Sequence, residues 1–75
     1  MSSTKELVQS GKKYLTECKF NEALDCFEQS LVSDPHNPNL LNLKGVALRI
    51  LGRYKESLEC YNKSLELDPR DKDAS

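Results

Sequence analysis

The chain repeats itself with a period of 34 residues. Residues 20–35 read FNEALDCFEQSLVSDP, and residues 54–69 read YKESLECYNKSLELDP. When residues 4–37 are laid over residues 38–71 without a gap, nine positions are identical. Self-similarity at a period of this length is typical of proteins built from stacked copies of one supersecondary unit. The sequence therefore predicts two equivalent units, at 4–37 and 38–71, followed by a short polar tail at 72–75.

Each unit carries the pattern of two amphipathic helices, with apolar residues recurring at helical spacing. The expected helices span residues 4–17, 20–32, 38–51 and 54–67. The third helix is apolar around most of its girth, so we expect it to be buried on several sides and to lie at the centre. The predicted fold class is all-α, formed by two helix–turn–helix repeats.

Local signals mark where these helices begin. Ser3 and Glu6 form a capping box at the start of the first helix. Asn37 caps the third helix, and Pro38 takes its first position, where a missing N–H costs nothing. Pro35 and Pro38 together forbid a continuous helix between the two units.

The two turns inside the units differ at one position. Gly52 supplies a left-handed C-cap in the second unit, whereas the equivalent residue of the first unit is Cys18. A non-glycine residue at positive φ costs roughly 1 kcal/mol, so we expect the first turn to be the weaker one.

Stripes of apolar or small residues predict the packed face of each outer helix. The predicted stripes are Leu7, Gly11, Tyr14 and Leu15 in the first helix, Phe20, Ala23, Leu24, Phe27 and Leu31 in the second, and Tyr54, Leu58, Tyr61 and Leu65 in the fourth. A helical glycine costs about 1 kcal/mol relative to alanine. Because Gly11 recurs as Gly45, we expect a packing reason, in which the partner helix passes too close for a side chain.

Composition narrows the function classes. The formal net charge of −1 disfavours nucleic-acid binding, which calls for a basic face. No apolar run approaches the ~20 residues of a membrane span, and the N-terminal residues lack the apolar core of a signal peptide. A cytoplasmic, soluble protein of one small domain is the expectation.

Residues with reactive side chains are few and scattered. The three cysteines form no CxxC pair, and we interpret Cys26 and Cys60 as small helix residues of a reducing compartment rather than as disulfide or zinc ligands. His36 is the only histidine and stands in the proline-flanked loop. No catalytic triad, phosphate loop or metal motif is found, so neither an enzyme nor a cofactor is predicted.

The pattern resembles the tetratricopeptide repeat, a 34-residue helix–turn–helix with the signature W-x2-L-G-x2-Y, then A, F and P. In the first unit its places hold Leu7, Ser10, Gly11, Tyr14, Ala23, Phe27 and Pro35. In the second unit they hold Leu41, Lys44, Gly45, Leu48, Ser57, Tyr61 and Pro69. The departures are leucine for tryptophan, the polar Ser10 and Lys44, Ser57 for alanine, and Cys18 in the turn.

The resemblance implies a short right-handed α-α superhelix whose first helix of each pair lines a concave groove. Family members are protein-interaction scaffolds and usually lack enzymatic activity. By analogy, the groove side chains are Lys5, Val8, Gln9, Lys12, Asn39, Asn42, Leu43, Val46, Arg49 and Ile50. The basic clamp that some members use for the C-terminal carboxylate of chaperones is not expected, because its places hold Val8, Lys12 and Leu43. The groove set includes an apolar strip of Leu43, Val46 and Ile50. This strip could bind a partner helix or an extended peptide, or it could pack within the fold or on a twin subunit.

Two hypotheses about function stay open. The first is a protein-interaction module that binds a peptide or partner helix through the concave groove. The alternative is a minimal structural or designed repeat whose only partner is itself. Self-association would use the uncapped edge of the fourth helix, formed by Leu58, Tyr61, Leu65 and Leu67, and would give a homodimer.

Overall fold

The computed structural model describes residues 4–67 and contains four α-helices and no β-strand within that range. The helices are α1 (Thr4–Thr16), α2 (Phe20–Ser33), α3 (Pro38–Ile50) and α4 (Tyr54–Leu67). Each begins and ends within one residue of its predicted bound, so the all-α prediction is confirmed. The capping box at Ser3 and the tail at 72–75 lie outside the described residues.

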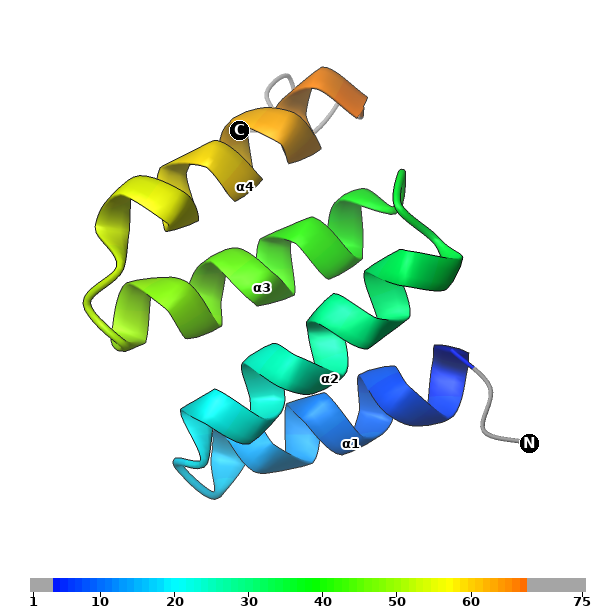
Figure 1. Cartoon of the computed structure of the whole chain (residues 1–75), viewed down its shortest axis with the longest axis vertical. Helices are drawn as coiled ribbons and strands as arrows, with labels where there is room; N and C mark the ends of the chain where they lie inside the picture. The colour runs from blue at the N-terminus through cyan, green and yellow to red at the C-terminus, as the bar shows by residue number, and fades with distance from the viewer. Residues whose placement is uncertain (1–3, 68–75) are drawn as a thin grey trace.

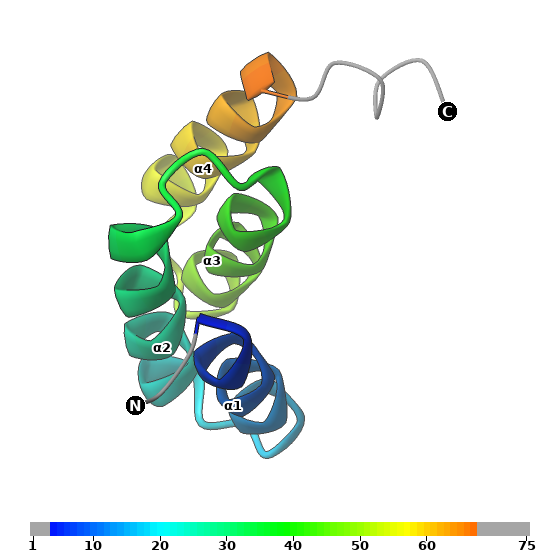
Figure 2. The same ribbon diagram turned by 90° about the vertical axis from the view of Figure 1, so that its right-hand side faces the viewer.

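The helices stack in chain order, from α1 at one end to α4 at the other (Figure 1). Extensive contacts join α1 to α2, α2 to α3, and α3 to α4. Seen from the side, successive helices follow a zigzag (Figure 2). The result is two α-hairpins laid one on the other, the arrangement of an α-α repeat superhelix, with α3 packed between α2 and α4 as predicted.

The third helix begins where the sequence indicates. Asn37 Oδ1 accepts hydrogen bonds from the backbone N–H groups of Asn39 at 2.9 Å and Leu40 at 3.3 Å, and Pro38 is the first helical residue. Asn37 Nδ2 also donates to Asp34 Oδ2 at 2.9 Å, which holds the cap in place. These bonds satisfy two of the backbone donors that every helix leaves unpaired at its start.

Both turns inside the hairpins use a left-handed residue. The φ angle is 64° at Cys18 and 87° at Gly52. In each turn the next N–H reaches back to the helix: Lys19 N donates to Tyr14 O at 2.8 Å, and Arg53 N donates to Leu48 O at 2.9 Å. This is the Schellman arrangement, and it forms at Cys18 in spite of the side chain.

The core lies between the two hairpins. Leu24 packs with Ala47, Leu48 and Cys60, each less than a tenth exposed. Phe27 is fully buried. Since α2, α3 and α4 all contribute, neither hairpin buries its apolar surface without the other.

The helical glycines make room for aromatic rings. A Cβ added to Gly11 would lie 2.5 Å from Cε1 of Phe27, and a Cβ added to Gly45 would lie 3.0 Å from Cε1 of Tyr61. The predicted packing reason is thus present. It is the ring of the partner helix, rather than its backbone, that occupies the space.

The prediction for the packed face of α4 is wrong. Tyr54 is 64% exposed and Leu58 is 61% exposed, and Leu65 is also exposed. The buried residues of α4 are instead Ser57, Cys60 and Ser64. Helical spacing grouped these large residues on one stripe, but most of that stripe is exposed rather than packed on α3. Only Tyr61, which is half-buried, contacts α3, at Gly45.

Serines pack against α3 because their small side chains allow a close approach and their hydroxyls find acceptors. Ser57 Oγ donates to the Gly45 carbonyl at 2.7 Å, and Ser64 Oγ donates to the Pro38 carbonyl at 3.1 Å. A buried hydroxyl without such a bond would cost about 1–3 kcal/mol. The two bonds fasten both ends of α4 onto α3.

Candidate functional site

A groove opens between the N-terminal parts of α1 and α3, which lie on the same side of the stack (Figure 1). Its volume is about 450 Å³. The residues that line it come from α1, from the cap of α3 and from the first turns of α3: Thr4, Lys5, Val8, Gln9, Lys12, Asn37, Asn39, Leu40 and Leu43. The groove is therefore a product of the way the second hairpin stacks on the first.

The groove brings together part of the predicted set. Six predicted residues line it: Lys5, Val8, Gln9, Lys12, Asn39 and Leu43. Four do not: Asn42, Val46, Arg49 and Ile50. Three of those four lie on the later turns of α3, whereas the α3 residues of the groove lie between 38 and 43. The prediction spread the site over the whole helix, and the hollow occupies one end.

Three lining residues were missed by the sequence reasoning: Thr4, Asn37 and Leu40. A signal existed for two of them. Thr4 precedes Val8 by four residues and Leu40 precedes Leu43 by three, and such neighbours share a helix face. Asn37 was recognised as a cap, but a cap residue precedes the helix whose face the family analogy assigned to the groove.

The groove has an apolar floor and a positive rim. Leu40 is buried, and Val8 and Leu43 are half-buried. Lys5 and Lys12 are exposed and stand two turns apart on α1, about 10 Å along the helix axis. Within residues 4–67 neither amine takes part in an ion pair. Such a surface can hold an apolar side chain while the lysines attract carboxylates.

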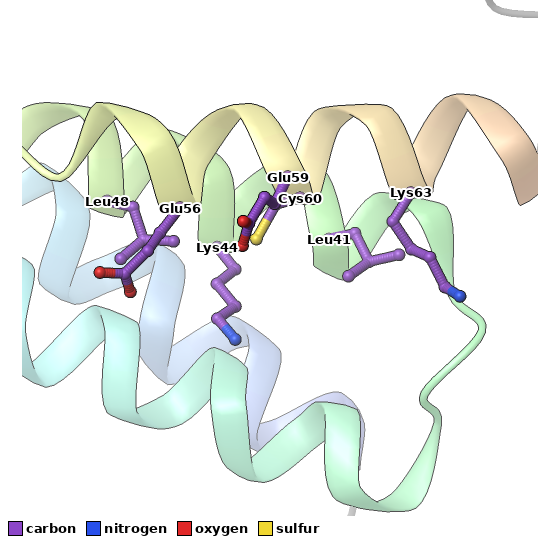
Figure 3. A pocket seen from close by; sticks show the side chains of 7 residues that line it. All are labelled: Leu41, Lys44, Leu48, Glu56, Glu59, Cys60 and Lys63. Carbon is purple, nitrogen blue, oxygen red and sulfur yellow. The ribbon is translucent and has the colours of Figure 1, made fainter.

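A second, smaller hollow of about 180 Å³ lies between α3 and α4 (Figure 3). Leu41, Lys44 and Leu48 of α3 line it together with Glu56, Glu59, Cys60 and Lys63 of α4. Lys44 extends toward α2, where its Nζ lies 3.8 Å from Glu28 Oε2. Charges of both signs surround this hollow, so its electrostatics favour no single class of ligand.

The cysteines are all free thiols. Burial raises the pKa of the Cys60 thiol above its ordinary 9.0, and burial followed by the nearby Asp25 carboxylate raises that of Cys26. Raised pKa values keep these thiols protonated at neutral pH, which makes them poor nucleophiles and poor metal ligands. Within residues 4–67, no three His, Cys, Asp or Glu residues lie close enough together to hold a metal ion. His36 is exposed in the loop between α2 and α3.

The predicted self-association edge lies on the outer side of α4. Leu58 and Leu65 are exposed, and Tyr61 and Leu67 are half-buried. No other described helix covers this side (Figure 1). The edge is thus accessible in the described part of the chain, and its use remains a prediction.

No helix within residues 4–67 has both the length and the apolar character needed to cross a membrane. Comparison with protein-family models matches residues 38–71 to the tetratricopeptide repeat. The four helices fit two helix–turn–helix repeats of this kind. Tetratricopeptide repeats are generally protein–protein interaction modules and are typically non-catalytic. A search of curated proteins gave no match.

Proposed function

Because residues 38–71 are a tetratricopeptide repeat and the four helices fit two such repeats, we propose that this chain is a protein-interaction module, with 4–37 as the first repeat. Its binding site is the groove between α1 and α3. The ligand is a peptide segment with an apolar anchor side chain flanked by acidic residues. The observation that carries the proposal is the groove of about 450 Å³ with its apolar floor and lysine rim.

The dimensions and the charges of the groove support this choice. Its volume lies within the ~300–1,000 Å³ typical of ligand sites. Val8, Leu40 and Leu43 offer apolar surface to one or two side chains. The ammonium groups of Lys5 and Lys12 carry positive charge that no described carboxylate pairs with. An acidic-apolar peptide matches both features, whereas a basic peptide would be repelled.

The test is a titration of the isotopically labelled chain with acidic-apolar peptides, observed through backbone amide chemical shifts. We expect shifts confined to α1 and the first turns of α3, with affinity that falls as salt is added. Lys12→Glu should weaken binding at least tenfold. Lys13→Glu is the matched control, because Lys13 is the adjacent lysine of α1, is exposed and does not line the groove. Equal loss in both variants, or shifts outside the groove, would argue against this site.

The alternative is a chain whose only partner is itself, joined as a homodimer through the outer edge of α4. The exposure of Leu58 and Leu65 supports it. Analytical ultracentrifugation separates the two functions, because the interaction module keeps a mass of 8.5 kDa without peptide. A concentration-dependent excess of mass that Leu65→Lys abolishes, with no response to peptides, would favour the alternative.

A further inference from the structure

The groove lies along two parallel helices. α1 and α3 run in the same direction, and α2 runs between them in the opposite direction (Figure 1). α2 packs on both helices, yet none of its residues lines the groove. Figure 2 shows α2 to one side of α1 and α3. The pair formed by α1 and α3 thus holds an antiparallel helix on one side and presents the groove on another.

The two lysines of the groove rim repeat with the period of a helix. Lys5 and Lys12 are seven residues apart, which is two turns and about 10 Å along α1. Val8 lies between them in the chain, and Leu40 and Leu43 line the same groove from α3. The groove therefore presents a cation, an apolar surface and a second cation in order along α1.

An amphipathic helix laid along α1 matches this order. Side chains at places i and i+7 of a helix lie about 10 Å apart on one face, and those at i+3 and i+4 lie between them. A carboxylate at each end can then meet one lysine while the apolar pair fills the floor. In an extended peptide, side chains of one face lie about 7 Å apart at i+2 and about 13 Å apart at i+4, so neither spacing matches both lysines.

Backbone hydrogen bonding also favours a helical ligand. An extended segment has unpaired N–H and C=O groups along its length, which a sheet edge can satisfy. Residues 4–67 offer no sheet edge, and the walls of the groove are helices whose backbone groups, beyond the first turn, bond internally. The side chain of Asn37 is already bonded to the start of α3 and to Asp34. A helix needs none of these partners, because it pairs its own backbone.

The helix dipoles favour one direction for the ligand. α1 and α3 both contribute their N-terminal turns, the positive ends of their dipoles, to the groove. The first turn of α3 contains no acidic residue that would offset this charge. A ligand helix antiparallel to both places the negative end of its own dipole there. Its first acidic side chain then meets Lys12, and its second meets Lys5.

A second copy of this chain does not supply such a helix. Within residues 4–67, the one pair of acidic residues seven places apart is Glu59 and Glu66. The places between them that would fill the floor hold Asn62 and Lys63, which are polar and exposed. The ligand therefore has to come from a different protein.

We infer that the groove binds an acidic amphipathic helix of another protein, which lies antiparallel to α1 and α3 and carries carboxylates at i and i+7 with apolar residues at i+3 and i+4. This inference rests on the proposed function and specifies the conformation, the spacing and the direction of its ligand. Charge complementarity identifies the occupant, because Lys5 and Lys12 form no ion pair with a described carboxylate.

The probe is a synthetic peptide of about 18 residues with blocked ends, long enough to be partly helical in water. Its core is Glu-Gln-Ala-Leu-Leu-Gln-Ala-Glu, flanked by alanine and glutamine. It is added to the isotopically labelled 75-residue chain, and backbone amide shifts are followed. We expect shifts in α1 and the first turns of α3, and helical carbon shifts in the bound peptide.

Two control peptides test the conformation and the spacing. The first has proline in place of the core alanine before the leucines, which keeps the charges and the apolar pair but breaks the helix. The second exchanges the last core glutamate with the nearer glutamine, so that the acids are five places apart and leave the common face. Each should bind at least about tenfold more weakly than the probe.

Exchange of charges tests the direction. Lys12→Glu should weaken binding of the probe at least about tenfold, and a peptide with lysine at the first core glutamate should restore it. Lys5→Glu should be restored by lysine at the second core glutamate instead. Lys13→Glu is the matched control, because this neighbouring lysine is exposed and does not line the groove. It should leave the affinity for the probe unchanged.

Two results would overturn the inference while the proposed function stands. One is a proline peptide that binds in the groove as tightly as the probe, which would make the ligand extended. The other is restoration of Lys12→Glu by lysine at the second core glutamate, which would make the helices parallel. If no acidic-apolar peptide shifts α1 or the first turns of α3, the proposed function itself fails, and this inference fails with it.

Discussion

Replacing Gly11 by alanine sets two effects of known sign against each other. Helix propensity favours alanine over glycine by about 1 kcal/mol in a helix interior. Against this, the new Cβ would lie 2.5 Å from Cε1 and 2.9 Å from Cζ of Phe27. Carbon atoms prefer separations of about 3.5–4.0 Å, so either the ring or α1 must move.

The magnitude follows from how little Phe27 can yield. Its side chain is fully buried, so its ring has no solvent to move into. Overpacking of a filled core costs about 1–3 kcal/mol, and a contact this short belongs in the upper part of that range. After subtracting the propensity gain, we expect Gly11→Ala to lower the free energy of unfolding by about 1–2 kcal/mol.

The repeat supplies a matched control. A Cβ at Gly45 would lie 3.0 Å from the ring of Tyr61, which is half-buried and can shift outward. Gly45→Ala should therefore stay within about 1 kcal/mol of wild type. Urea unfolding followed by circular dichroism measures both variants, together with Phe27→Leu and the double variant of Gly11 and Phe27.

The double-mutant cycle isolates the contact. If the ring is the obstacle, Gly11→Ala should cost little in the Phe27→Leu background, which gives a coupling energy of about 1–2 kcal/mol. Two results would refute the reasoning. One is a Gly11→Ala variant that is stabilised by the full propensity gain. The other is a coupling energy near zero.

Other variants test the core, the turns and the thiols. Leu48→Ala or Phe27→Ala should lower the free energy of unfolding by about 2–5 kcal/mol, because both side chains are buried; a melting temperature within a degree or two of wild type would contradict this. Cys18→Gly should stabilise by up to about 1 kcal/mol by relieving a φ of 64°, whereas Gly52→Ala should destabilise by a similar amount; opposite signs in urea unfolding would overturn the assignment of strain. Burial raises the pKa of Cys60 in the folded state, so above pH 9.0 the unfolded thiol loses its proton first and stability should fall as pH rises. Cys60→Ala should flatten that alkaline slope, and an unchanged slope would show that other groups cause it.

Much of the fold can be predicted from the sequence because its signals are local. The 34-residue period gave the number of helices, and residues such as Asn37 and Pro38 gave their beginnings. The repeat also indicated that Cys18 adopts the left-handed conformation of Gly52, which the φ angles confirm. Each signal depends on backbone geometry within one or two turns, so it is readable without knowing the neighbours.

The orientation of α4 was decided only by the tertiary structure. Periodicity grouped Leu58 and Leu65 on one stripe, but it cannot say which neighbour that stripe meets. The face that meets α3 must be small enough for close approach, and Ser57 and Ser64 provide this because the carbonyls of α3 accept their hydroxyl protons. A serine whose hydroxyl donates to a buried carbonyl can therefore lie in the core. A pattern of polar and apolar residues cannot identify such a serine, because it counts every serine as polar.

The groove depended on the stacking in the same way. Lys12 and Leu43 belong to different hairpins, and only the packing of α2 against α3 brings them to one hollow. The resemblance to the tetratricopeptide repeat indicated which helix faces line it, and six of the residues expected by that analogy do so. The sequence could not show that the hollow ends after the first turns of α3. The extent of the hollow depends on the distance between the helices, and that distance depends on how large buried residues such as Phe27 and Leu48 pack.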